Sequence, residues 1–168
     1  MNDGMEKGDE KYNFYQNCTS RTQAGMDREF FDNARLCRKR KGGVYLYHEI
    51  LSITRSSKLS LDEQKHLLRT LAQRYVSQRA KGNIVYGVLH GEKENNLHYH
   101  LCMSANAFGE SNRTFFNKKE FVEIHKGIEL HALEHYPELE QVKLLSQDKN
   151  QEKERDKDKS KVSSREYA

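Results

Sequence analysis

Apolar residues in the middle of the chain recur at the spacing of three helices. The first helix is predicted over residues 26–37, where apolar side chains return near every third or fourth position. The second begins at Ser60, which forms a capping box with Glu63, and it ends at Gly82. The third is predicted over residues 117–136, between a capping asparagine and a proline.

Three strands are predicted between these helices. Residues 44–53, 83–90 and 97–104 are rich in β-branched and aromatic residues and are bounded by glycine or polar residues. The first of these strands is mostly apolar on both faces, which predicts a central place in the sheet. The other two are separated by the polar turn GEKENN and are predicted to form a β-hairpin.

The order helix, strand, helix, strand, strand, helix predicts an α+β fold in which helices pack on an antiparallel sheet. The folded domain is predicted over residues 12–141, because the chain is polar before this range and highly charged after it. Residues 1–11 are a polar N-terminal segment. Residues 142–168 are a charged C-terminal extension that has no apolar face to bury.

Composition narrows the class of protein. The 168 residues are 32% charged, with a mean hydropathy of −1.00, so one domain with a modest core is expected. No apolar run approaches the roughly 20 residues of a membrane span and the N-terminus has no secretory signal, so no membrane insertion and a cytoplasmic location are predicted. Three cysteines without paired spacing do not form a disulfide framework. A net charge of +4 is compatible with a nucleic-acid partner.

Three of the eight histidines fall on the predicted hairpin. His98 and His100 are two residues apart on one strand and share a face, and His90 on the neighbouring strand lies within cross-strand or diagonal reach. Three such imidazoles can bind a divalent cation and leave coordination positions for water or substrate, and Glu92 could accept the second ring N–H of one ligand. The alternative to a metal site is that these are ordinary strand histidines without a ligand. A lone His-x-His pair would favour that alternative, but the third histidine favours the metal site.

The remaining histidines are given other roles. Residues 131–135, HALEH, match the H-x-x-E-H pattern of inverted zinc peptidases. Only a charged tail follows to supply the further ligand, so these histidines are predicted to lie at the surface near a helix end. His48 is predicted to be a core or sheet residue rather than a fourth ligand. His66 and Arg79 are assigned to the solvated face of their helix.

Residues 89–104, LHGEKENNLHYHLCMS, resemble the third motif of the conjugative relaxases, mobilisation nucleases of the His-hydrophobe-His (HUH) endonucleases. The family pattern is a histidine, an acidic residue two positions later, Asn-Leu or His-Pro, and then His-x-His with a hydrophobic strand. The matching residues are His90, Glu92, Asn96, Leu97, His98 and His100. The family more often has Asp at position 92 and commonly has Asn where Ser104 stands.

The second relaxase motif is similar to residues 47–52, YHEILS, which precede a capped helix. The resemblance assigns to Ser52 a contact with DNA near the nick. From the residues alone, Ser52 is equally well a strand-end residue whose hydroxyl is hydrogen-bonded. The resemblance extends over roughly residues 15–140.

The resemblance implies a relaxase-like palm that nicks one DNA strand at a transfer origin during plasmid mobilisation or conjugation. In the family a tyrosine attacks the phosphodiester and leaves a 5′-phosphotyrosyl link and a free 3′-hydroxyl. The family uses Mg²⁺ or Mn²⁺, and three imidazoles would also suit Zn²⁺. Implied partners are single-stranded DNA at the origin, accessory mobilisation proteins and a coupling protein.

The family's tyrosine follows its first strand, near the N-terminus. Only Tyr12 and Tyr15 stand upstream of the matching segment, and both are close to Asn17. We therefore expect the first strand and its nucleophile to be missing, with these two tyrosines as the only upstream candidates. The chain would then be a fragment, the product of a split gene or a degenerate copy. Two alternatives keep the same site: a non-catalytic relaxase remnant that binds single-stranded DNA, and hydrolysis by water.

A basic run follows the first predicted helix. It consists of Arg38, Lys39, Arg40 and Lys41. These side chains could follow a single-stranded phosphate backbone. They could equally form a solvated helix end that complements the helix dipole.

Overall fold

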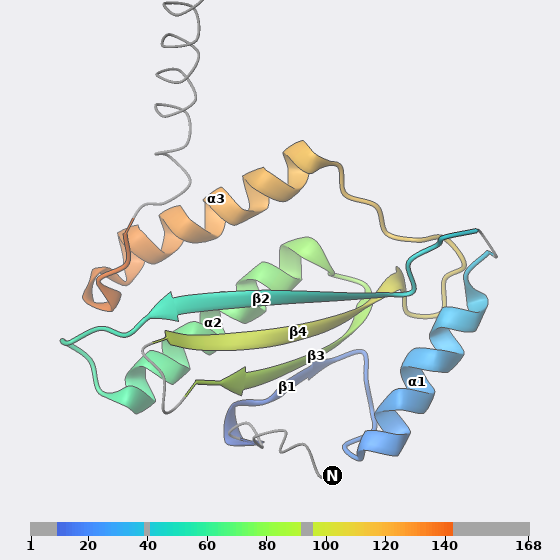
Figure 1. Ribbon diagram of the computed structural model, residues 1–168, viewed down its shortest axis with the longest axis horizontal. Helices are drawn as coiled ribbons and strands as arrows, with labels where there is room; N and C mark the ends of the chain where they lie inside the picture. The colour runs from blue at the N-terminus through green and yellow to red at the C-terminus, as the bar shows by residue number, and fades with distance from the viewer. Residues whose placement is uncertain (1–9, 39–40, 92–95, 143–168) are drawn as a thin grey trace, which may run out of the picture.

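The computed structural model describes residues 10–38, 41–91 and 96–142 (Figure 1). It has an α+β fold with an antiparallel four-stranded sheet, which confirms the predicted fold class. The polar N-terminal segment before residue 10 and the charged extension from residue 143 lie outside the described residues.

The strands of the sheet lie in the order β1-β3-β4-β2, and every neighbouring pair is antiparallel. The strands are β1 (Phe14–Gln16), β2 (Leu46–Thr54), β3 (Asn83–His90) and β4 (Asn96–Ala107). Strands β3 and β4 form the predicted hairpin, and β4 is held on both sides by β3 and β2. The hairpin is therefore the centre of the sheet.

In the described ranges, three helices and two short 3-10 helices accompany the sheet. They are η1 (Glu10–Tyr12), α1 (Gln23–Leu36), α2 (Leu61–Arg79), α3 (Lys118–His135) and η2 (Pro137–Leu139). The predicted capping box of α2 is present: the Ser60 hydroxyl accepts from the Glu63 backbone N–H, and the Glu63 carboxylate accepts from the Ser60 N–H. Asn117 and Glu120 form the same reciprocal pair at the start of α3.

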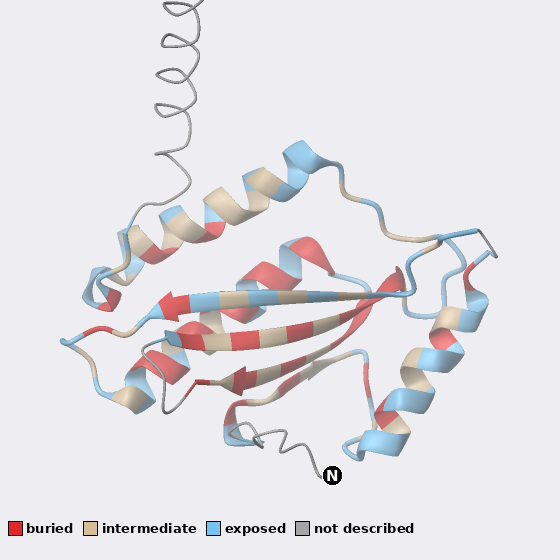
Figure 2. Cartoon of the chain, in the orientation of Figure 1, coloured by how far each residue is buried: buried red, intermediate tan, exposed pale blue. Residues whose placement is uncertain are grey.

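The main core lies between the sheet and helices α2 and α3. Strand β4 contributes Tyr99, Leu101 and Met103, which are completely buried, while the residues between them are only partly buried. This alternation follows from the two-residue period of a strand, and it is visible as alternating colours along β4 in Figure 2. The odd-numbered positions therefore anchor β4 in the core, and the even-numbered ones face outward.

Helix α1 covers one end of the second face of the sheet. Met26 on α1 packs there against Ile84 and Cys18, with the rings of Tyr15 and Tyr86 at its border. In Figure 1, α1 lies to one side of the sheet. We call this second face the open face, because no other helix of the described ranges packs on it.

Two sequence predictions about strands are wrong. Residues 44–53 were predicted to be a central strand, but β2 is an edge strand, and Ile50 on its outer face is 56% exposed. The Gln141 side chain covers one end of this edge, because its amide bonds both backbone groups of Thr54. Strand β1 lies within the first 16 residues, where no strand was predicted. Its three residues are too few to show a period, and it pairs with β3 through Tyr15 and Tyr86.

Candidate functional site

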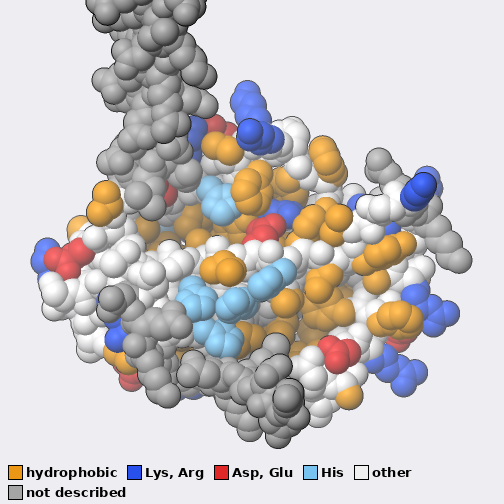
Figure 3. Space-filling view, in the orientation of Figure 1, with side chains coloured by type: hydrophobic (Ala, Val, Ile, Leu, Met, Phe, Trp, Pro, Cys, Tyr) orange, Lys and Arg blue, Asp and Glu red, His pale blue; other side chains and the backbone are white. Residues whose placement is uncertain are grey.

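The three predicted metal ligands lie together on the open face of the sheet. His98 and His100 alternate with the buried Tyr99 on β4, so the packing of the core fixes the side to which they point. His90 ends β3 and is paired directly with His98 across the ladder. All three side chains are partly exposed, and histidines form one continuous cluster on this face in Figure 3.

The three imidazole rings are close neighbours. The ring centroids of His90 and His98 are 6.0 Å apart, and the planes are nearly parallel, at 18°. The His100 ring is edge-on to both, with centroid distances of 4.9 Å to His90 and 5.0 Å to His98. The sequence therefore predicted correctly that these rings come together.

The ring spacing and the donor type fit a shared cation. Imidazoles bound to one ion through nitrogens about 2.0–2.1 Å away have ring centroids about 5 Å apart. Among the described side chains, no group of three His, Cys, Asp or Glu is placed to hold a metal ion. The torsion χ2 of histidine is broad, so the rings can turn toward a cation without moving the strands.

A fourth histidine, His48, belongs to the same cluster. It is a sheet residue, one of the two alternatives that were predicted, and its side chain is exposed on edge strand β2. Its Nε2 is 2.8 Å from Nδ1 of His100. Sequence reasoning missed this contact because it depends on how β2 pairs with β4, where His48 is opposite Cys102 and diagonal to His100.

The environment of His100 favours the neutral imidazole. Burial is the main cause that lowers the pKa of His100, and the nearby His90, His98 and His48 lower it further by charge repulsion. A neutral ring is the form that binds a metal. Burial and the neighbouring imidazoles therefore both favour the uncharged form of His100.

The turn after His90 depends on a glycine. Gly91 has a φ of +99°, and a Cβ atom at this position would lie 2.2 Å from the backbone oxygen of Asn96. Gly91 also accepts a hydrogen bond from the Arg55 guanidinium at 2.8 Å. The close approach of the two strands beside His90 and His98 therefore requires the absence of a side chain.

Ser52 lies beside the cluster. It is exposed, it is paired with His98 across β2 and β4, and its hydroxyl donates to the carbonyl of Leu97 at 3.3 Å. Arg38 and Lys41 are exposed at the other end of β2, in the segment before it. Glu92, Lys39 and Arg40 lie outside the described residues.

Tyr12 does not join the histidines. It is buried, its phenol donates to Oδ1 of Asp62 at 3.0 Å, and its carbonyl accepts from the Tyr99 hydroxyl at 2.7 Å. Tyr99 points away from the face that carries His98 and His100. Tyr12 is therefore on the opposite side of the sheet.

Tyr15 shares the open face but is distant from the cluster. Its ring stacks on Tyr86 with centroids 5.1 Å apart, and the Arg21 guanidinium lies 4.1 Å from its ring centre. Tyr86 precedes His90 by four residues on β3, which is roughly 13 Å along a strand, and it precedes Val88, the partner of His100, by two residues, roughly 7 Å. Strand β3 separates Tyr15 from β4, which carries His98 and His100.

A polar network under the sheet was not predicted. Arg79 donates to Oε1 of Glu49 at 2.8 and 3.1 Å, and Tyr75 donates to the other carboxylate oxygen. His125 on α3 is 3.1 Å from the Tyr75 hydroxyl. The prediction that Arg79 lies on a solvated face is wrong, because it is 5% exposed. This network joins β2, α2 and α3 and does not face the histidine cluster.

Two other surface features do not contribute to the histidine site. The ring centroids of His131 and His135 are 4.1 Å apart near the end of α3, and His135 is exposed, as predicted.

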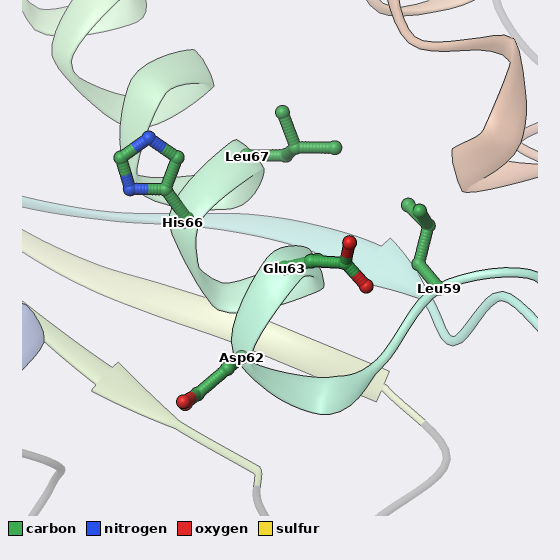
Figure 4. A pocket seen from close by; sticks show the side chains of 5 residues that line it. All are labelled: Leu59, Asp62, Glu63, His66 and Leu67. Atoms are coloured by element: carbon green, nitrogen blue, oxygen red, sulfur yellow. The ribbon is translucent and has the colours of Figure 1, made fainter.

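A shallow depression at the start of α2 is shown in Figure 4. It is lined by Leu59, Asp62, Glu63, His66 and Leu67. Because α2 packs on the core side of the sheet, this depression lies away from the cluster.

Comparisons with known protein families, with curated proteins and with solved structures found no match for this chain. Within the ranges that the structure describes, no helix combines the length and the apolar character that crossing a bilayer requires.

Proposed function

We propose that this chain is a metal-dependent, relaxase-type nuclease domain that nicks single-stranded DNA at a transfer origin. The observation that carries the proposal is the convergence of His90, His98 and His100 on an exposed face, with ring centroids 4.9 to 6.0 Å apart. Three imidazole donors on a partly exposed face are typical of a catalytic rather than a structural metal site.

The three imidazoles would hold the cation, and Mg²⁺, Mn²⁺ and Zn²⁺ all remain candidates. A cation held there would neutralise charge on the non-bridging oxygens of the scissile phosphate. Ser52, opposite His98, has a hydroxyl at the border of the cluster. This hydroxyl donates its one proton to the Leu97 carbonyl, so it would exchange that bond for one to a phosphate oxygen.

Single-stranded DNA is the substrate that the open face suits. The face carries stacked aromatic rings at Tyr15 and Tyr86, with the Arg21 guanidinium on the outer ring. Proteins bind single strands by combining aromatic stacking with cationic groups. Arg38 and Lys41 add positive charge at the end of β2. Accessory mobilisation proteins and a coupling protein would be partners of such a domain.

The positions of Tyr12 and Tyr15 favour a second candidate function, in which no tyrosine attacks the DNA. Tyr12 is buried on the core side of the sheet, and Tyr15 lies on β1, two strands away from β4, which carries His98 and His100. A chain without a phenol at the cation would bind single-stranded DNA without cutting it, or would hydrolyse it with water. Hydrolysis would cut the DNA, whereas binding alone would leave it intact.

The test uses a random-sequence library of single-stranded oligonucleotides labelled at the 5′ end, incubated with the chain and Mn²⁺. A covalent protein–DNA adduct found by mass spectrometry, with labelled fragments that end in a 3′-hydroxyl, supports the relaxase. Cleavage without an adduct indicates hydrolysis, and salt-dependent binding without cleavage indicates the DNA-binding remnant. If the chain neither binds nor cleaves the oligonucleotides, all three hypotheses are contradicted.

The matched variants are His98→Ala and His66→Ala. His98 belongs to the cluster, whereas His66 is an exposed histidine on α2. Cleavage that disappears in His98→Ala and persists in His66→Ala assigns the chemistry to the cluster. Cleavage that is unchanged in both variants contradicts this assignment.

A further inference from the structure

The two rings of His48 and His100 are joined by an in-plane hydrogen bond. Their planes differ by only 10°, their centroids are 5.0 Å apart, and Nε2 of His48 is 2.8 Å from Nδ1 of His100. If the rings were stacked face to face, a nitrogen–nitrogen distance of 2.8 Å would bring their centroids closer than 5.0 Å. The rings therefore lie edge to edge. The geometry is that of a direct N–H···N bond.

This bond can form with the proton on either nitrogen, and the choice decides what His100 can do. If His48 donates, His100 carries its proton on Nε2 and has no lone pair left for a cation. If His100 donates from Nδ1, its Nε2 is bare, on the side of the ring away from His48. Only the second arrangement makes His100 a metal ligand, because a ligating histidine donates its other ring N–H to a neighbour.

The position of His48 suits this role. It is exposed on an edge strand, so its ring is not part of the buried core. Its contact with His100 is diagonal across the β2–β4 ladder, which is continuous from Leu46 to Thr54. The register of the sheet therefore holds the two rings at bonding distance.

We propose that His48 is a positioning residue that accepts the Nδ1 proton of His100 and thereby presents Nε2 of His100 to the cation. The proposal rests on the proposed function, because the cation is the one that His90, His98 and His100 would share. A neutral imidazole takes the place that a carboxylate or a backbone carbonyl usually has beside a ligating histidine.

The first test measures the tautomer directly in the metal-free protein. Long-range ¹H–¹⁵N correlation spectra at pH 8 distinguish a protonated Nδ1 from a protonated Nε2, and His100→Gln identifies the signals of His100. We expect His100 to carry its proton on Nδ1 in the wild-type chain and to lose this preference in His48→Leu. A proton on Nε2 in the wild-type chain, or an unchanged spectrum in the variant, overturns the proposal.

The second test measures Mn²⁺ binding by calorimetry. We expect His48→Leu to weaken binding by about 10-fold or more, as removal of such a partner does in other metal sites. His48→Gln places an amide oxygen where the ring Nε2 was, so it should restore most of the affinity. His66→Leu is the control at an exposed histidine outside the cluster, and thermal unfolding checks that each variant is folded.

The outcomes separate the two proposals. Wild-type binding that is unchanged in His48→Leu overturns the positioning role and leaves the three-histidine site intact. Equal losses in His48→Gln and His48→Leu also overturn it, because the acceptor would then not matter. A wild-type chain that binds no Mn²⁺ contradicts the metal site of the proposed function, and the positioning role fails with it.

Discussion

His90 and His98 face each other directly across the β3–β4 ladder, with ring centroids 6.0 Å apart. The two strands meet there because Gly91 follows His90 with a φ of +99° and leaves room for the carbonyl of Asn96. The geometry of the cluster thus depends on a residue that has no functional group. This dependence gives a first prediction.

Gly91→Ala should destabilise the chain and disturb the cluster. The new Cβ would be 2.2 Å from the Asn96 oxygen, so the ladder must open in addition to the backbone strain of about 1–3 kcal/mol. Gly42→Ala is the matched control, since Gly42 has a φ of +68° but a Cβ there meets no atom within 4 Å. We expect the control to lose about 1–2 kcal/mol and Gly91→Ala to lose more, measured by urea unfolding. Equal losses would show that the close approach at Gly91 does not matter.

Removal of one partner of the buried ion pair should be costly. Arg79→Met leaves the Glu49 carboxylate in a half-buried site without its cation, so we expect the free energy of unfolding to fall by about 2–4 kcal/mol. Arg74→Met changes an exposed arginine on the same helix and should stay within about 0.5 kcal/mol of wild type. The double variant Glu49→Gln with Arg79→Met should recover part of the loss. Similar stabilities for Arg79→Met and Arg74→Met would contradict a structural role of the pair.

Acid should weaken the domain through His125. Burial, the main cause, lowers the pKa of His125 below its ordinary value of about 6.5; Arg79 lowers it further, and Glu49 opposes the shift. Between the folded pKa and 6.5 the unfolded chain binds more protons, so the free energy of unfolding falls as the pH drops through this window. His125→Gln should make this dependence shallower in urea unfolding between pH 8 and pH 5. His100 and His131 have pKa values lowered in the same direction, so part of the slope should remain. A slope identical to that of wild type would exclude His125 as a source.

The hairpin and its histidines could be predicted because they depend on local rules. Alternation along one strand places His98 and His100 on one face, and a six-residue turn brings His90 beside them. The capping boxes at Ser60 and Asn117 are local in the same way. Each of these features is decided by residues close together in the sequence.

The features that sequence reasoning missed depend on distant partners. His48 reaches His100 only because β2 pairs with β4, and the apolar composition of β2 wrongly predicted a central strand. Arg79 is buried because Glu49, 30 positions earlier, supplies the opposite charge. No local pattern in the sequence contains either relationship.

The most direct test of the metal site is a Mn²⁺ titration of the wild-type chain and of His90→Ala, His98→Ala and His100→Ala. Because the three rings lie within 6.0 Å of each other on a partly exposed face, each substitution should leave the fold intact and remove one ligand. We expect one ion per wild-type chain and a large loss of affinity in each of the three variants. Binding that is absent from the wild-type chain, or that survives all three substitutions, would contradict the account.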